Sequence, residues 1–368
     1  MTASPSQPNY WEYIRVEELL SLQGGLEGDE AQLSNDEVMF ITVHQVYELW
    51  FKLLLRELAS LRNLLKQPVD DARMAEAVGG ARRASTILRR CVDHFEVMET
   101  LTTRAYLAFR DKLMPASGFQ SAQMRQMEIL LGLPDEERIG LGLEGSYLDA
   151  LRAHGGASSP ALERVQRTRA DRPTLREAFE AWLHRTPIDG VGPDHPQAER
   201  ELDRFLSSYA AAHALQVDAS HRSARILVRT PEDERKLAER YGSEKRSLLE
   251  FLSPPGPDGA GRRRRRAALL FILTYCHLPL LAWPHALVEA MIELEQHLVI
   301  FRQRHARMVE RVIGRRVGTG GSSGVDYLDQ TALAYRVFRD LWSVRTYQIR
   351  ADLAPALQRP QFFAFAPR

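Results

Sequence analysis

The first candidate for chemistry is a single histidine on the apolar face of a long predicted helix. His305 shares this face with large apolar side chains at spacings of three and four residues: Leu294, Leu298, Phe301, Met308 and Val312. A histidine in this setting is usually a core residue that is hydrogen-bonded to a neighbour. It is also suited to ligate the iron of a heme, because a neutral imidazole binds iron and the flat macrocycle needs apolar neighbours. The pattern alone leaves both interpretations open.

A second histidine lies in a polar and aromatic segment, DEVMFITVHQVYELWFK, at residues 36–52. At helical spacing, one face of this segment carries Phe40, His44, Tyr47, Glu48 and Phe51. An aromatic stripe of this kind is more often core than binding site. Polar groups buried in an apolar helix are costly without partners, however, and a pocket for a ring that bears one N–H group would accommodate them.

A third candidate is the pair Tyr106 and Arg110, which are four residues apart and share a face if this segment is helical. An arginine is suited to bind a carboxylate through two parallel hydrogen bonds. The competing interpretation is a local salt bridge between Arg110 and Asp111.

A glycine- and serine-rich segment, GTGGSSG at residues 318–324, follows the predicted helix of His305. It lacks the Gly-Lys-Ser/Thr ending of a phosphate-binding loop. Its glycines permit the backbone changes of a mobile lid over a substrate. A flexible linker is the alternative.

The elements that position these residues are predicted to be helices. Apolar residues recur at three- and four-residue intervals without a convincing period of two, so an all-α fold is expected. Ser34 and Glu37 form the pattern of a capping box before the first long helix. The predicted helices are 35–65, 72–98, 121–132, 174–184, 197–218, 231–252, 264–283, 285–316 and 326–349, with loops at 153–172 and 186–197.

Composition excludes several classes of protein. The chain has 368 residues, 44% of them hydrophobic, and a formal net charge of +1, so nothing global indicates nucleic acid or an anionic membrane. Two cysteines exclude a disulfide scaffold and are typical of the cytoplasm. The N-terminus lacks a secretion signal, and the most apolar stretch, 267–283, contains His277 and Pro279, which favours a buried helix over a membrane span.

Five consecutive arginines occupy positions 262–266. We interpret them as a solvated helix start after a disordered loop. Nucleic-acid binding is the weaker alternative, because no aromatic residues interleave with the run.

Two strings in the chain resemble one known family closely. FRDKLMPASGFQSAQMR and GRRVGTGGSSGVDYL are similar to segments of tryptophan 2,3-dioxygenase, the heme enzyme that begins tryptophan breakdown through kynurenine. The resemblance covers residues 9–23, 35–58, 95–132 and 298–347. It implies an all-helical homotetramer, a dimer of dimers, that contains heme b and acts on L-tryptophan and dioxygen.

The resemblance also implies roles for single residues. By position, His305 is the proximal heme ligand, and Ser117 and Gly118 contact the cofactor. His44 hydrogen-bonds the indole N–H group, and Phe40 forms a wall of the indole pocket.

The remaining roles concern the amino-acid end of the substrate and the neighbouring subunit. The resemblance implies that Arg110, with Tyr106 beside it, holds the substrate carboxylate. Thr319 then partners the ammonium and carboxylate groups. Tyr10, Tyr13 and Ile14 belong to an N-terminal stretch that reaches into a neighbouring subunit's pocket.

Two positions depart from the family pattern. Val43 stands where the family usually has glutamine, and Asn35 where it often has histidine. Neither is a reacting group. The expected product is N-formyl-L-kynurenine. The alternatives are a monooxygenase of the same family acting on a modified tryptophan or an oxindole, and a non-enzymatic heme or indole sensor.

The chain is expected to divide into four parts. Residues 1–34 form an arm and helix between subunits, and 35–149 the first part of the heme and substrate core. Residues 150–265 match the family poorly and are expected to be a helical and loop insertion of open role. Residues 266–368 contain the heme-ligand helix, the glycine-rich loop and a C-terminal helix.

Overall fold

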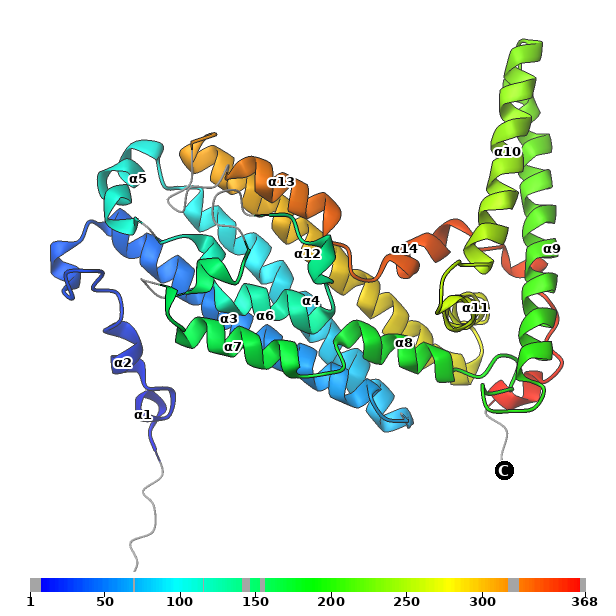
Figure 1. Cartoon of the computed structure of the whole chain (residues 1–368), viewed down its shortest axis with the longest axis horizontal. Coiled ribbons are helices and arrows are strands. Elements are labelled where there is room, and N and C mark those ends of the chain that lie inside the picture. Colours follow the sequence, from blue (N-terminus) through cyan, green and yellow to red (C-terminus); the bar gives the residue numbers. More distant parts are fainter. Residues whose placement is uncertain are drawn as a thin grey trace, which may run out of the picture.

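The computed structural model describes residues 8–68, 70–114, 116–140, 146–152, 156–316 and 324–364. The α-helices in this part of the chain are α1 (Tyr10–Ile14), α2 (Val16–Leu20), α3 (Asn35–Leu65), α4 (Asp71–Met98), α5 (Thr103–Phe109), α6 (Ala122–Leu131), α7 (Pro160–Ala170), α8 (Leu175–Arg185), α9 (Ala198–Ala224), α10 (Pro231–Leu252), α11 (Gly259–Thr274), α12 (Ala282–Ile313), α13 (Val325–Ala334) and α14 (Arg339–Thr346) (Figure 1). No β-strand occurs among these residues. The expected all-α fold is confirmed.

The centre of the bundle is formed by α3, α4 and α12, which pack against one another through α4 (Figure 1). On α3 the buried apolar residues recur at helical spacing: Val43, Tyr47, Phe51, Leu54, Leu58, Leu61 and Leu65. Fully burying each such side chain stabilises the fold by about 1.5–3 kcal/mol. α6 and α8 cover α3, and α13 covers α12.

Among the described helices, α3 is also the one with the length and apolarity to cross a membrane. That is weak evidence, because the core helix of a soluble protein meets the same criteria. The packing of α3 against α4, α6 and α8 is that of a helix within a bundle.

The predicted capping box at the start of α3 is half formed. The Ser34 hydroxyl accepts a hydrogen bond from the backbone N–H of Glu37 at 3.2 Å. The Glu37 carboxylate does not return a bond to Ser34, because it pairs with Lys112 at 3.0 Å. Lys112 also pairs with Glu27 at 2.7 Å. The start of α3 is thereby tied to the turn after α5 and to the root of the N-terminal segment.

Three predicted boundaries were wrong. A helix, α7, occupies much of the predicted loop 153–172, because Ser159 caps it and Pro160 stands at its first position, where no donor is needed. The predicted helix 264–283 ends at Thr274, and Pro284 lies inside the first turn of α12.

The predicted helix 326–349 is two helices, α13 and α14, and a buried carboxylate explains the break. Glu295 of α12 is 2% exposed and accepts hydrogen bonds from the backbone N–H groups of Val337 and Phe338 at 2.5 and 2.8 Å. It also accepts one from the Trp342 indole. These bonds hold the connection between α13 and α14 in a non-helical conformation.

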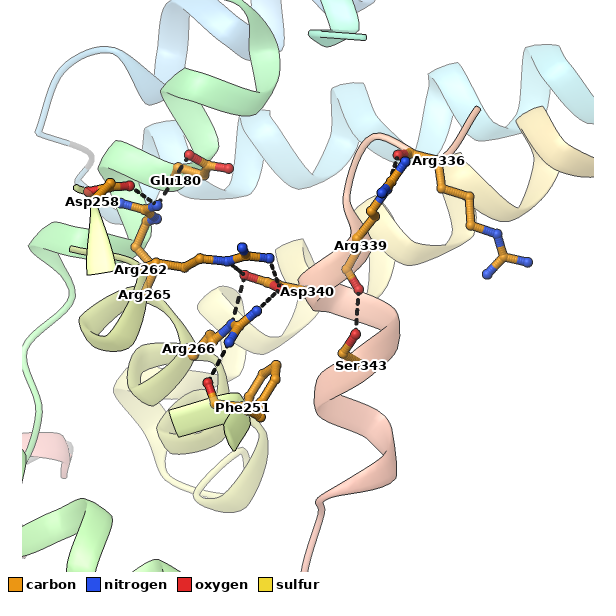
Figure 2. A network of polar contacts seen from close by, with 10 residues as sticks. All are labelled: Glu180, Phe251, Asp258, Arg262, Arg265, Arg266, Arg336, Arg339, Asp340 and Ser343. Carbon is orange, nitrogen blue, oxygen red and sulfur yellow. Dashed lines mark hydrogen bonds and ion pairs between the residues drawn. The ribbon is translucent and has the colours of Figure 1, made fainter. Parts of the chain in front are cut away.

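The five arginines of α11 are structural, and the prediction of a solvated helix start was wrong for most of them. Arg262 and Arg266 both donate two hydrogen bonds to Asp340 of α14 at 2.9–3.1 Å (Figure 2). Arg264 is 3% exposed and donates to the carbonyl oxygens of residues 184 and 186. Arg263 pairs with Asp203 and Arg265 with Asp258. We call Arg262, Arg266 and Asp340 the arginine clamp.

The middle of the chain contributes both to the core and to a projection from it. Leu175, Phe179, Leu202, Tyr209 and Phe251 belong to the same buried apolar cluster as α3 and α12. Beyond that cluster, α9 and α10 continue side by side as a helical hairpin that stands away from the bundle (Figure 1). The four-part division of the chain stays a prediction.

Candidate functional site

α3 and α5 place several aromatic rings in contact. The Phe40 ring centroid lies 4.2 Å from that of His44, 5.4 Å from Phe109 and 6.2 Å from Tyr106. Tyr106 and Phe109 are buried and meet edge to face at 5.6 Å. The structure therefore brings Phe40, His44 and Tyr106 together, although the first two and the last are far apart in the sequence.

The His44 ring is held as a neutral hydrogen-bond acceptor. Its Nδ1 lies 2.7 Å from the backbone carbonyl of Phe40, and because a carbonyl only accepts, Nδ1 carries the proton. Burial lowers the pKa of His44, against the opposing effects of the Phe40 carbonyl and Glu48. The side chain nevertheless keeps exposed surface, so the ring is enclosed by protein on most sides and open on another. Its Nε2 is left as an acceptor with no partner among the described residues.

The other polar residues of this face have partners within the chain. The Tyr47 hydroxyl donates to the Cys91 carbonyl at 3.0 Å. Gln45 accepts a hydrogen bond from the Gln23 side chain and donates one to the Leu22 carbonyl. Glu48 accepts hydrogen bonds from Ser121 and Gln123 at 2.6 and 2.7 Å. His44 is thus the polar group of this segment that is left for a ligand.

Arg110 lies at the end of α5, one helical turn from Tyr106. A side-chain hydrogen bond joins the two, and together with the arginine charge it opposes the burial that raises the pKa of Tyr106. Lys112 of the same turn pairs with Glu27 and Glu37. Arg110 therefore stands beside the aromatic group that contains Phe40 and His44.

α12 places His305 against two phenylalanine rings. Its ring stacks on Phe95 of α4 at 5.5 Å with an interplanar angle of 8°, and Phe301 lies 6.2 Å away. Burial, then the proximity of His44 and of Arg302, lowers the pKa of His305 to about 4. No described residue hydrogen-bonds the ring. At neutral pH His305 is an uncharged imidazole in apolar surroundings, the form that ligates a metal.

The two histidines lie within electrostatic reach of each other on α3 and α12, which both pack against α4. Each lies close enough to its neighbours for electrostatic coupling, His44 to His305 and also to His94 of α4. The Tyr47 ring of α3 contacts rings of both α4 and α12. Its centroid lies 5.0 Å from that of His94, 5.1 Å from that of Phe95 and 6.2 Å from that of Phe301. Segments more than 200 residues apart in the sequence therefore meet at one site.

The turn before α6 contains two further expected residues, Ser117 and Gly118. The Ser117 backbone N–H donates to the Gln120 side chain at 3.2 Å. A side chain added at Gly118 would meet no described atom within 4 Å, so space is open beside it. Ser121 and Gln123 tie this turn to Glu48 of α3. Thr319 lies outside the described residues.

Tyr10, Tyr13 and Ile14 do not join this site within one chain. They lie on α1, which together with α2 extends away from the bundle (Figure 1). Their exposed fractions are 73%, 78% and 44%. Trp11 is 56% exposed on the same short helix, and neither α1 nor α2 contains a buried residue.

Three residues of the site were missed by the sequence analysis: His94, Phe95 and Phe109. His94 has a buried Nε2 without a described partner. Phe95 supplies the ring that stacks on His305. α4 carries a stripe of apolar residues at helical spacing along its length, so Phe95 and the adjacent His94 near its end look like core residues. A signal existed in the adjacency of His94 and Phe95, which no other histidine of the chain shares.

The fold and the site define a class, an all-helical protein with a partly buried, neutral imidazole suited to a metal-bearing prosthetic group. The comparisons with known proteins make the class specific. Residues 1–348 match the tryptophan 2,3-dioxygenase family, to which the chain belongs.

Individual relatives agree. The chain is 51% identical to a tryptophan 2,3-dioxygenase of Sorangium cellulosum, over 97% of this chain and 87% of that protein. It is 50% identical to tryptophan 2,3-dioxygenase 2 of Ralstonia nicotianae, over 97% and 98%. A tryptophan 2,3-dioxygenase-like protein of Xanthomonas campestris is 47% identical, over 72% of this chain and 98% of its own length. The first two matches include residues 150–265, which are therefore shared with these relatives.

Proposed function

We propose that this chain is a heme-dependent dioxygenase that cleaves the indole 2,3 double bond of L-tryptophan with dioxygen, giving N-formyl-L-kynurenine. One observation carries the proposal. His305, an uncharged imidazole, and His44, an open acceptor, lie within electrostatic reach of each other in a chain of this family. The two free cysteines are consistent with a soluble protein of the cytoplasm.

The residues present fit heme b. His305 is neutral, has no competing hydrogen bond among the described residues, and lies against Phe95 and Phe301. We assign it as the iron ligand, with Ser117 and Gly118 as further contacts of the cofactor. When bound, the heme supplies the iron that activates dioxygen.

His44 orients the indole. Its Nε2 accepts a hydrogen bond from the indole N–H, because Nδ1 is already engaged as the donor to Phe40. The Phe40 ring forms a wall against which the indole lies. The Nε2 acceptor stays available at pH values below the usual pKa of histidine, since burial lowers the pKa of His44 and keeps the imidazole uncharged.

Arg110 and Thr319 fix the other end of the substrate. The Arg110 guanidinium binds the carboxylate, and its hydrogen bond with Tyr106 holds it in place. Thr319 partners the ammonium and carboxylate groups. Fixing both ends converts a bimolecular encounter into a positioned one.

A second copy completes the site. An arm that exposes Tyr10, Trp11, Tyr13 and Ile14 carries more apolar surface than a free terminus keeps in water. We assign these residues to the pocket of a neighbouring subunit in a homotetramer.

The decisive experiment is the product formed from tryptophan and labelled dioxygen. A dioxygenase gives a ring-opened product that carries both labelled atoms. One labelled atom and an intact ring would establish the monooxygenase instead. Heme binding without any product would establish the sensor.

The shared pocket is tested by mixing two inactive variants, one lacking residues 1–14 and one carrying His305→Ala, under conditions of subunit exchange. Mixed oligomers should regain partial activity, because an intact arm completes a heme-bearing neighbour. Confirmed exchange without recovered activity contradicts a shared site.

A further inference from the structure

A lysine close to Arg110 joins three separate elements of the chain. Lys112 lies in the 3-10 turn of residues 110–113, two positions after Arg110. Its ammonium group pairs with Glu27 of the N-terminal segment at 2.7 Å and with Glu37 of α3 at 3.0 Å. Hydrogen bonds to both carboxylates raise the pKa of Lys112, so the side chain remains charged. The proposed chemistry does not use this ammonium group.

The turn that contains Arg110 has little apolar anchorage of its own. None of its four residues is buried, and Leu113 packs only partly against the core. Met114, which follows the turn, is 58% exposed. A single 3-10 turn has poorer hydrogen-bond geometry than an α-helix, so its own backbone stabilises it weakly. The position of Arg110 therefore depends on polar contacts of the turn, and Lys112 makes two of them.

One of the two carboxylates is buried, which distinguishes this contact from a surface ion pair. Glu37 is 6% exposed, whereas the side chains of Lys112 and Glu27 are 37% and 26% exposed. An exposed ion pair contributes little to stability, but a buried carboxylate that loses its partner is strongly unfavourable. Glu37 therefore holds the Lys112 ammonium group beside the first turn of α3.

Residues 22–27, which we call the strap, are fixed at one end beside His44. The Gln23 side chain donates a hydrogen bond to the side chain of Gln45 at 2.6 Å. Gln45 donates in turn to the Leu22 carbonyl at 2.9 Å. Gln45 directly follows His44 on α3. The first end of the strap is thus anchored next to the residue that we assign to the indole.

The other end of the strap is fixed beside Arg110, through the pair of Glu27 with Lys112. Between the two ends the chain turns tightly, because a Cβ atom at Gly24 would lie 2.6 Å from the backbone carbonyl carbon of Gly28. A residue without a Cβ atom permits this close approach. The strap is therefore a short, closely packed link between α3 and the turn that contains Arg110.

We propose that Lys112 is a positioning residue for substrate binding. By joining the strap and α3 to the turn of Arg110, it sets the separation between the Arg110 guanidinium and the His44 acceptor to the length of tryptophan. A substrate that has both an indole N–H group and a carboxylate is held at both ends, and its binding depends on that separation. The proposal rests on the proposed function, because Lys112 acts through Arg110.

The test compares kcat and KM for tryptophan and for tryptamine in the heme-loaded protein. Lys112→Met removes the charge and keeps a side chain of similar length. It should raise KM for tryptophan about 10-fold, a fraction of the roughly 100-fold that a misplaced group can cost. The kcat for tryptophan and both constants for tryptamine should change little, because the loss is one of carboxylate binding.

Two further variants serve as controls. Lys112→Arg keeps the charge and should restore most of the affinity for tryptophan. Lys236→Met, at an exposed lysine of α10 that pairs with Glu232, is the matched control and should change neither substrate. Equal losses for tryptophan and tryptamine in Lys112→Met would show a purely structural tie and overturn the proposal.

A double-mutant cycle tests whether Lys112 acts through Arg110. In the Arg110→Ala protein, Lys112→Met should have no further effect on KM for tryptophan, because the group that it positions is already absent. Losses that add in the double variant contradict a positioning role.

Glu27→Gln decides the case in which Lys112→Met does not fold. It neutralises the partly exposed carboxylate and leaves the pair of Lys112 with Glu37 intact. It should raise KM for tryptophan by a smaller factor than Lys112→Met and leave tryptamine unchanged. A loss selective for tryptophan in Arg110→Ala, with none in the Lys112 and Glu27 variants, overturns the positioning role and leaves the proposed function standing. No selective loss in Arg110→Ala counts against the proposed function, and the positioning role falls with it.

Discussion

The arginine clamp and the region between His44 and His305 differ in whether their polar groups have hydrogen-bond partners within the described part of the chain. In the clamp, Asp340 accepts four hydrogen bonds from Arg262 and Arg266, so its charge is satisfied within the chain (Figure 2). Between the histidines, the Nε2 of His44 and the ring of His305 have no partner among the described residues. A group that folding leaves unsatisfied is costly unless a ligand completes it.

Whether a polar group has a partner within the chain distinguishes structural residues from functional ones better than residue type does. In the sequence, the five consecutive arginines look like a solvated helix start, and each of the two histidines could be a core residue or part of a site. The contacts reverse that impression. Changes in the clamp should therefore reduce stability and leave the chemistry intact, whereas changes between the histidines should do the opposite.

The largest effect is expected for His305→Ala. The variant should lose nearly all heme and remain helical, because one imidazole supplies the bond from the protein to iron and alanine favours a helix. The measurement is the Soret absorbance after titration with hemin, beside circular dichroism. His297→Ala is the matched control on α12, since His297 is a satisfied residue hydrogen-bonded to Ser85 at 2.8 Å. Heme loss in the control and not in His305→Ala would refute the assignment.

Arg110→Ala should have the next largest effect. A charge-assisted contact with a carboxylate is worth about 1.5–3 kcal/mol, which is roughly a 10- to 150-fold loss in kcat/KM for tryptophan. Tryptamine, which lacks the carboxylate, should lose far less. Arg104 is an exposed arginine of α5, and Arg104→Ala should change kcat/KM for neither substrate. Equal losses for tryptophan and tryptamine would indicate a structural role for Arg110.

The sequence predicted the helices of the bundle well, because their stability comes from apolar spacing that can be read along the chain. α3, α4, α9 and α10 begin within about two residues of their predicted starts. What it could not predict depended on distant partners. The break between α13 and α14 is set by Glu295, some forty residues earlier, and the burial of Arg264 by carbonyl oxygens at the end of α8.

Part of the site was also predictable, because it depends on residue spacing along one helix. Phe40 and His44 share a helix face, so their contact follows from spacing. The stacking of His305 on Phe95 joins α12 to α4, and no local pattern indicates it. The role of Thr319 stays a prediction.

In the clamp, Asp340→Asn should lower the free energy of unfolding by about 2–4 kcal/mol, because two guanidinium groups lose a half-buried anion. The expected activity per folded heme-bearing protein is unchanged. Chemical denaturation measures the free energy of unfolding. Asp352→Asn is the control, since its pair with Arg350 is exposed on both sides and should matter little.

The pH dependence of that loss has a definite sign. Burial alone would raise the pKa of Asp340, but hydrogen bonds from Arg266 and Arg262 outweigh it and lower the pKa below its usual 3.8. A carboxyl with a lowered pKa stabilises the fold above the pKa of the unfolded chain, and that contribution disappears as pH falls through the folded value. The difference between Asp340→Asn and the unchanged protein should therefore be constant near neutral pH and shrink below about pH 4. A difference that grows on acidification would contradict the clamp.

The smallest expected effect is the difference in stability between variants of two neighbouring arginines, Arg263 and Arg264. Arg264 is 3% exposed and satisfies the carbonyl oxygens of residues 184 and 186, so Arg264→Ala leaves buried acceptors unpaired and should cost about 1–3 kcal/mol. Arg263 pairs with Asp203, whose side chain is 62% exposed, and Arg263→Ala should cost less than about 1 kcal/mol. Denaturant midpoints of the two variants measure the difference. High salt should increase the difference between the two variants, because ions screen the exposed ion pair and barely affect hydrogen bonds to buried carbonyls. The small loss in Arg263→Ala should therefore vanish at high ionic strength while that in Arg264→Ala persists. Equal losses would mean that the run acts as one solvated charged surface, as the sequence first indicated.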